Sequence, residues 1–193
     1  EEGCCNNYGS ISFPIYQTAT YEHPAVGQST GFDYSRLQNP TREHLEKIVA
    51  TLENGIDALA FSTGMAAITL VMELFKPGDH LIIDADLYGG SIRLFDNVSS
   101  KNGIHFSRID CWKENVESYV NENTKAIYLE TLGNPNSDIP DIDAISAIAK
   151  KHGLPVVVDN TFGTPYLFRP IEHGADIVVH SATKFIGGHG TSL

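Results

Sequence analysis

PVVVDN, at Pro155–Asn160, and DIVVHS, at Asp176–Ser181, are the two stretches that decide the fold. Each is a short run of Val and Ile without a polar face, and each ends on polar residues. Strands that are buried on both faces have this composition, which is typical of a parallel sheet covered by helices. Ligands of such sheets bind at the carboxyl ends of the strands. We therefore expect the chemistry of this chain at the polar residues that follow the strands.

Similar apolar runs alternate with helical segments along the chain, which indicates an α/β fold with a mainly parallel sheet flanked by helices. Helical spacing of apolar residues marks the helices, and the first of them has Asn39 as N-cap, Pro40 at its first position and its end at Asn54-Gly55. The other expected helices cover 64–75, 91–102, 114–121 and 141–153, and the other expected strands are ALAF (58–61), HLIID (80–84), HFSRID (105–110) and AIYLE (126–130).

The first 38 residues do not follow this alternation. They are poor in periodicity and rich in Tyr, Thr, Pro and Gly, as in SFPIYQTATYEHPAVGQSTGF at 12–32, which predicts an extended arm. We therefore divide the chain into an arm, 1–38, and one large domain, 39–193. Because the chain has no initiator methionine and stops directly after a glycine-rich loop, we expect it to be a piece of a longer protein.

Composition and charge exclude several classes of partner. The 193 residues include 13 Lys and Arg against 24 Asp and Glu, and the net charge of −11 would repel nucleic acid and anionic lipid. No apolar run reaches the length that spans a membrane. Cys4, Cys5 and Cys111 offer no CxxC pair, so we interpret them as free thiols of a cytoplasmic protein.

Three features at the expected strand ends suggest chemistry when they are taken together. The turn before Gly64 opens a helix, whose free N–H groups favour an anion, although such turns also occur as simple helix caps. Asp159 ends a buried strand, where a carboxylate either pairs with a cation or accepts hydrogen bonds from the loop amides. Lys184 follows Ser181 and Thr183; an extended chain would point these hydroxyls away from the amine, and a desolvated amine can form an imine.

One ligand uses all three features. Pyridoxal 5′-phosphate (PLP) needs a lysine for its imine, a carboxylate for its ring nitrogen and donors for its phosphate. Lys184 follows Asp159 by 25 residues, which leaves room for a turn, a short helix and a strand between them. We therefore expect PLP at this edge of the sheet, although a lysine at a strand end can also extend into solvent.

The chain resembles the Cys/Met-metabolism family of PLP-dependent enzymes, a transsulfuration family of fold type I similar to O-acetylhomoserine sulfhydrylases and cystathionine γ-synthases. Nearly the whole chain takes part in the resemblance. The motifs that carry it, in the order of the family, are PIYQTAT, YSRLQNPT, STGMAAI, DLYGG, ETLGNPN, VVVDNTFGTP and HSATKFIGGHG.

The resemblance implies a role for each site residue. Lys184 is similar to the Schiff-base lysine, Asp159 to the partner of the pyridinium nitrogen, and Tyr88 to the aromatic residue that stacks on the ring and assists proton transfer. Asn134 resembles the residue that binds the phenolic oxygen. The expected phosphate ligands are the backbone of Gly64 and Met65, the hydroxyls of Ser181 and Thr183, and Tyr34 and Arg36 from a neighbouring subunit.

The resemblance also implies a reaction and an assembly. The reaction is γ-replacement on an O-acylhomoserine, a small amino-acid substrate, by sulfide or a thiol. Cystathionine γ-synthase, cystathionine γ-lyase and methionine γ-lyase are the alternatives, and Gly90 speaks against the last because methionine γ-lyases usually have a cysteine there. The assembly is a homodimer or a homotetramer, formed as a dimer of dimers, in which Tyr34 and Arg36 reach the neighbouring site.

Some features point away from a complete enzyme of this kind. Members of the family have a C-terminal domain with the arginine that grips the substrate carboxylate; we expect that domain to be absent here, and Arg93 and Arg169 not to replace it. A non-enzymatic fragment that binds only cofactor or a partner is therefore an alternative. Ser181 to Lys184 also satisfies the SxxK pattern of serine acyl-enzymes, which requires the serine to open a helix.

The histidines do not predict a metal site. His173, His180 and His189 are seven and nine residues apart, which fits no short ligand motif, so we expect structural or surface roles for them and no metal.

Overall fold

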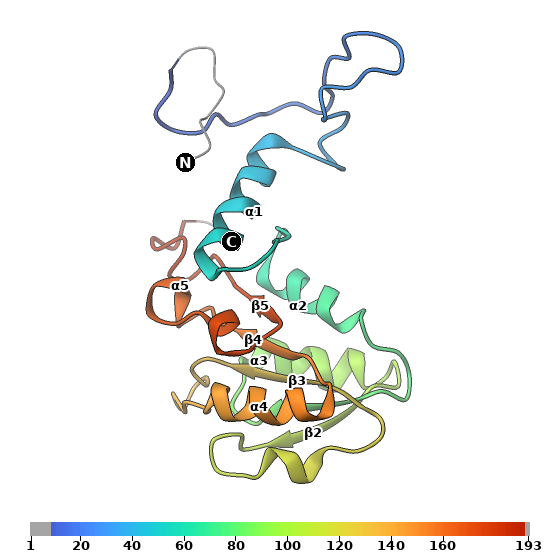
Figure 1. Ribbon diagram of the computed structural model, residues 1–193, viewed down its shortest axis with the longest axis vertical. Helices are drawn as coiled ribbons and strands as arrows, with labels where there is room; N and C mark the ends of the chain where they lie inside the picture. The colour runs from blue at the N-terminus through green and yellow to red at the C-terminus, as the bar shows by residue number, and fades with distance from the viewer. Residues whose placement is uncertain (1–8, 192–193) are drawn as a thin grey trace. The chain divides into compact units, whose positions relative to one another are not determined.

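The computed structural model describes residues 9–191 in two compact units, one ending at Ala60 and the other beginning at Phe61 (Figure 1). The predicted arm ends at residue 38, whereas the first unit ends at Ala60. The first unit therefore contains the described part of the arm and also the first helix. Cys4 and Cys5 lie outside the described residues. Cys111 is a free thiol, as predicted, and it is buried.

The first unit consists of an irregular arm and the helix α1 (Pro40–Glu53). Asn39 caps the helix, because its side chain accepts a hydrogen bond from Thr41 N at 2.9 Å, and the left-handed Asn54 ends it. Both ends were predicted from the sequence. The arm is fastened to the start of the helix: Tyr16 N donates to Thr41 Oγ1 at 2.9 Å, and Asn39 Nδ2 donates to the Tyr16 carbonyl at 3.1 Å.

The second unit is built on a five-stranded sheet in the order β2-β1-β3-β4-β5, and every neighbouring pair is parallel. The α/β fold with a parallel sheet is therefore confirmed. Its strands are β1 (His80–Asp84), β2 (His105–Ile109), β3 (Thr124–Glu130), β4 (Val156–Asp159) and β5 (Ile177–Val179).

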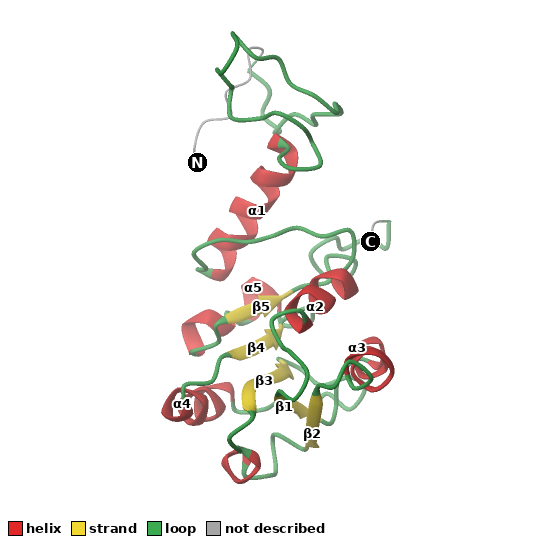
Figure 2. Ribbon diagram, turned by 90° about the vertical axis from the view of Figure 1, so that its right-hand side faces the viewer, coloured by secondary structure: helices red, strands yellow, loops and turns green. Residues whose placement is uncertain are grey.

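Helices cover both faces of this sheet (Figure 2). One face packs against α2 and α3 through a core that includes Ile68, Leu81 and Tyr128, and the other packs against α4 through a core that includes Ile82 and Ile145. Neighbouring residues of a strand point to opposite faces, so Leu81 and Ile82 enter different cores. The helices are α2 (Gly64–Met72), α3 (Gly89–Leu94), the π-helix η1 (Phe95–Ser99), the 3₁₀ helices η2 (Val116–Tyr119) and η3 (Pro170–His173), α4 (Ile142–His152) and α5 (Thr164–Leu167).

Three predicted elements differ from the structure. The expected strand ALAF at 58–61 has no strand conformation, because no described strand pairs with it. The expected helix at 91–102 begins earlier, as α3, and continues as the π-helix η1, with Ser100 N bonded to the Phe95 carbonyl at 2.9 Å. The expected helix at 114–121 is only the short η2.

No helix among the described residues is long and apolar enough to cross a membrane. Within residues 9–191 there is also no group of His, Cys, Asp and Glu that could hold a metal ion. His173 instead bonds to Asp143 at 3.0 Å and stacks on Phe168 at a centroid distance of 4.3 Å.

Candidate active site

Buried carboxylates mark the carboxyl edge of the sheet. Glu130 ends β3 and Asp159 ends β4, and the two residues are partners in the register of these strands. Asp84 ends β1 next to them. All three side chains are buried. The polar residues that the sequence placed at strand ends therefore lie along one edge, as the parallel topology requires.

Thr161 links Asp159 to the loop after β5. The Thr161 N–H and hydroxyl donate to Asp159 Oδ1 at 3.0 and 2.5 Å, and Thr161 Oγ1 accepts from Ser181 N at 2.8 Å. Burial raises the pKa of Asp159, while these hydrogen bonds and the nearby His180 lower it. In the described part of the chain no Lys or Arg side chain forms an ion pair with Asp159. Its carboxylate is thus held in place and could take a cationic donor on Oδ2.

The start of α2 meets the same loop. A Cβ added to Gly64 would lie 2.8 Å from Ser181 Cβ, so glycine is what allows the helix start to approach Ser181. The N–H groups of Gly64 and Met65, in the first helical turn, have no acceptor within the helix. The hydroxyl of Thr63 caps this helix by accepting from Ala66 N at 3.0 Å. Free N–H groups, the helix dipole and a hydroxyl together form a suitable cradle for a phosphate.

Tyr88 lies where β1 leads into α3. Its N–H donates to Glu130 Oε1 at 2.6 Å, and its side chain is 42% exposed. The ring lies against Gly90, because a Cβ at that position would be 2.3 Å from Tyr88 Cε1. Burial, with smaller contributions from Asp159, Asp86 and Asp84, raises the pKa of Glu130 to about 8.

Asn134 is half-buried in the loop after β3. Its N–H donates to the Asp86 carbonyl at 3.2 Å, and the next peptide bond, to Pro135, is cis. The Asp86 carboxylate accepts from the N and Nδ2 of Asn136, both at 3.0 Å. The loop with Asn134 is therefore bound to the loop with Tyr88.

Lys184 differs from its prediction in two respects. The chain does not stay extended after β5 but turns, with Lys184 N bonded to the Ser181 carbonyl at 3.2 Å and Gly188 N bonded to the Lys184 carbonyl at 2.8 Å. The alternation of Ser181, Thr183 and Lys184 side chains expected for an extended chain is therefore wrong. Lys184 is also exposed, so the described residues alone do not desolvate its amine. Because Ser181 precedes a turn and opens no helix, the requirement of a serine acyl-enzyme is not met.

Tyr34 and Arg36 belong to the first unit. The Arg36 guanidinium lies 4.9 Å from the centroid of the Tyr34 ring, and both side chains are exposed. Tyr34 forms an isolated antiparallel bridge with Thr20, which fixes this part of the arm locally.

The residues at the sheet edge fit PLP in three ways. A buried carboxylate without an ion-paired base suits the ring nitrogen, the contact between Gly64 and Ser181 suits the phosphate, and the partly exposed ring of Tyr88 suits stacking. Asp159, Thr161 and Ser181 form one connected chain of hydrogen bonds between the first two of these places.

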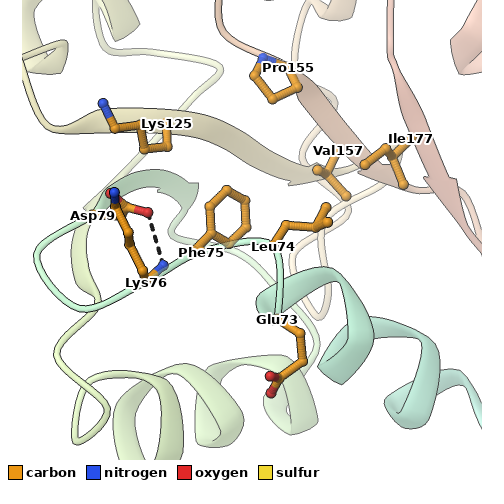
Figure 3. A pocket seen from close by; sticks show the side chains of 9 residues that line it. All are labelled: Glu73, Leu74, Phe75, Lys76, Asp79, Lys125, Pro155, Val157 and Ile177. Atoms are coloured by element: carbon orange, nitrogen blue, oxygen red, sulfur yellow. Dashed lines mark hydrogen bonds between the residues drawn. The ribbon is translucent and has the colours of Figure 1, made fainter.

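A separate pocket of about 520 Å³ lies at the opposite edge of the sheet (Figure 3). Lys125, at the start of β3, and Ile177, at the start of β5, line it together with Leu74 and Phe75 from the segment after α2. Because ligands of parallel sheets bind at the carboxyl ends of the strands, we assign no part of the candidate site to this pocket.

Three residues at the site, Asp86, Glu130 and Thr161, were not assigned roles from the sequence. Glu130 and Thr161 stand within the polar stretches that follow the strands, and the signal that could have found them is a carboxylate or hydroxyl at a buried position. Their hydrogen-bond partners in other loops could not be predicted from a single sequence.

Comparison with known proteins identifies relatives along nearly the whole chain. "Cystathionine gamma-synthase/O-acetylhomoserine (thiol)-lyase" of Bacillus subtilis is 53% identical over 96% of this chain and 50% of its own length. "Cystathionine beta-lyase" of Lactococcus lactis is 50% identical over 94% of this chain and 48% of its own length. The structure of cystathionine gamma-lyase from Lactobacillus plantarum, complexed with L-serine, matches with a TM-score of 0.92 and 44% identity over 96% of this chain and 49% of its own.

The chain spans about half the length of the curated relatives it matches. The five-stranded parallel sheet and its covering helices correspond to that half of the solved enzyme. The model of the family described as "Cys/Met metabolism PLP-dependent enzyme" matches residues 2–193. The chain therefore belongs to the family of PLP-dependent enzymes of Cys and Met metabolism.

Proposed function

We propose that this chain is the cofactor-binding part of an enzyme that performs γ-replacement on an O-acylhomoserine with sulfide or a thiol. The observation that carries the proposal is the connected edge of the sheet, where Asp159 is joined through Thr161 to Ser181, and Ser181 touches the start of α2 at Gly64. The name of the Bacillus subtilis relative, which joins γ-synthase and O-acetylhomoserine thiol-lyase activities, supports this choice of reaction.

The residues would divide the work as follows. PLP, when bound, supplies an electron sink for the bonds at the substrate's α and β carbons. Lys184 would hold the cofactor through its Nζ, and its free amine would move protons at these carbons of the substrate. Asp159 keeps the ring nitrogen protonated, Tyr88 stacks on the ring, and Asn134 binds the phenolic oxygen.

The phosphate would be bound at the second end of the site. The N–H groups of Gly64 and Met65 and the hydroxyls of Ser181 and Thr183 are its ligands from this chain. With the dipole of α2, they would offer several donors to one dianion and would hold the cofactor without a covalent bond.

Gly90 supports γ-replacement over elimination from methionine. The Tyr88 ring occupies the space where a side chain at position 90 would stand, so this site has no room for a cysteine beside the ring in its present position. Cystathionine γ-synthase and cystathionine γ-lyase activities stay as alternatives, because relatives of about 50% identity carry synthase and lyase names.

The arm and α1 would complete the site of a second copy of the protein, in a homodimer or a dimer of dimers. Apolar side chains on α1, Leu45, Ile48 and Leu52, are between 42 and 48% exposed, which favours their burial against another surface. Tyr34 and Arg36 are exposed in the same unit and would add a hydroxyl and a guanidinium to the phosphate of the neighbouring site.

Substrate assays of the purified protein with PLP test the reaction. O-acetylhomoserine with sulfide should give homocysteine, while methionine alone or cystathionine alone should give little 2-oxobutanoate. Faster release of 2-oxobutanoate from cystathionine than formation of homocysteine would replace our proposal with the γ-lyase alternative. PLP binding without turnover of any of these substrates would support the non-enzymatic alternative.

A further inference from the structure

Two loops at the candidate site are joined by hydrogen bonds to buried carboxyl groups, one from each loop. The first runs from the end of β1 to Tyr88, and the second runs from the end of β3 to Asn136. Asp86 of the first loop binds the second, and Glu130 of the second binds the first. We call these contacts the reciprocal clamp.

Asp86 accepts most of the hydrogen bonds of the reciprocal clamp. Its side chain is 8% exposed, and each carboxylate oxygen accepts one hydrogen bond from Asn136, from Nδ2 to Oδ1 and from the backbone N to Oδ2. Its carbonyl accepts from Asn134 N. The second loop lies directly on this carboxylate, because a Cβ at Gly133 would be 2.4 Å from Oδ2.

Glu130 makes the other half from the opposite direction. Its side chain is 4% exposed, and its Oε1 accepts from Tyr88 N at 2.6 Å. Tyr88 is held at its backbone by this bond, and its ring rests on Gly90. The two loops thus fix each other at the two positions that carry Tyr88 and Asn134.

The chemistry of the two carboxylates argues for a geometric purpose. Burying two carboxyl groups near one another is unfavourable, and in the described residues neither Asp86 nor Glu130 has an ion-paired base. Part of this cost appears in the pKa of Glu130, which burial and the neighbouring carboxylates raise to about 8, so that Glu130 is a neutral carboxyl group at neutral pH. A carboxylate can, however, accept hydrogen bonds on both oxygens, as Asp86 does, whereas an amide offers only one acceptor atom. Apolar side chains could pack the two loops together without this cost of burying polar groups. The hydrogen bonds of the pair therefore serve to fix the loops in one geometry.

We propose that Asp86 and Glu130 are positioning residues, which hold Asn134 and Tyr88 at fixed places around the cofactor ring. The proposal rests on the proposed function, since it takes Asn134 as the ligand of the phenolic oxygen and Tyr88 as the stacking residue. Neither carboxylate touches the reacting atoms.

The test compares Asp86→Asn with Asp79→Asn in protein purified with PLP. Asp79 is a matched control, because its side chain is 7% exposed, it accepts one backbone hydrogen bond, from Lys76 N at 2.9 Å, and it lies at the opposite edge of the sheet. The readout is the absorption and circular dichroism of the bound cofactor as a function of pH.

We expect Asp86→Asn to shift the midpoint of the cofactor's pH titration by about half to one pH unit, because Asn134 loses its fixed place beside the phenolic oxygen. Asp79→Asn should keep the titration of the unmodified protein. Equal titrations for all three proteins would overturn the positioning role of Asp86. If the unmodified protein binds no PLP, the proposed function itself fails, and this outcome is distinct from the first.

Three further substitutions decide the matter if Asp86→Asn does not fold. Asn136 is exposed, so Asn136→Ala should fold while it removes the donor to Asp86 Oδ1, and it should shift the titration in the same direction by a smaller amount. Glu130→Gln keeps an acceptor for Tyr88 N and should keep the dichroism of the bound cofactor, whereas Glu130→Ala should change it. An unchanged titration in Asn136→Ala, or equal dichroism in both Glu130 variants, would contradict the reciprocal clamp.

Discussion

Glu130 shows at the residue scale how burial sets the charge of the site. Burial raises its pKa from 4.5 to about 8, so between these values the folded chain holds a proton that the unfolded chain has lost. The free energy of unfolding of the cofactor-free protein should therefore fall as pH rises through this window.

Glu130→Gln removes this proton linkage. We expect the variant to be more stable than the unmodified protein by about 1–3 kcal/mol at about pH 9 and to lose that advantage at about pH 4. Urea unfolding at both pH values measures the difference. A variant that is less stable at the higher pH would show that the folded chain stabilises the charged form of Glu130.

The absence of a side chain at Gly90 determines where the Tyr88 ring can lie, and we expect the position of this ring to affect the reaction. Gly90→Ala would bring a Cβ to 2.3 Å from the Tyr88 ring, which must then turn away. Because Tyr88 is 42% exposed, its ring can turn towards solvent at little cost, so we expect a stability change under about 1 kcal/mol but a loss of γ-replacement turnover of about tenfold. Steady-state kinetics and thermal unfolding measure the two effects, and unchanged turnover would mean that the place of the ring does not matter.

At the scale of elements, the proposed phosphate site depends on the close approach of α2 to the loop after β5. Gly64→Ala would place a Cβ 2.8 Å from Ser181 Cβ and push the helix start away from the hydroxyl. We expect PLP affinity to fall by about tenfold or more, since part of the donor set would be lost.

Gly55→Ala is the control for this substitution, because its added Cβ would meet only backbone oxygens at 3.7 Å, an ordinary contact. It should bind PLP like the unmodified protein. Equilibrium titration of PLP, followed by its absorbance, gives both affinities. Equal PLP affinities for Gly64→Ala and Gly55→Ala would show that Gly64 does not contribute to phosphate binding.

The elements that sequence predicts well are those whose signals are local. The caps Asn39 and Asn54 bound α1, and the apolar runs ending at Asp84, Glu130 and Asp159 are strands. ALAF is also a short apolar run, but it has no strand to pair with, because a strand depends on its neighbour and not on its own residues alone. The contacts of Asp86 and Thr161, which join loops distant in sequence, were likewise not predictable from spacing.

At the scale of the whole molecule, the proposed site contains residues of two chains. If Arg36 acts in the neighbouring subunit, Arg36→Ala and Lys184→Ala should each be inactive as pure proteins. A mixed dimer of the two variants contains one site with both Lys184 and Arg36. Mixing and refolding equal amounts should restore roughly one quarter of the activity, because half of the dimers are mixed and one of their two sites is intact. A mixture that stays inactive would place Arg36 and Lys184 of one chain in the same site.

Lys184 is the residue on which the whole account depends, because it is exposed in the described chain and yet is assigned the covalent bond to PLP. Reduction of the PLP-loaded protein with borohydride, followed by peptide mass analysis, tests this assignment most directly. We expect one pyridoxyl adduct, on the peptide that contains Lys184, and none in Lys184→Ala. An adduct on a different lysine, or no adduct in the unmodified protein, would contradict the account.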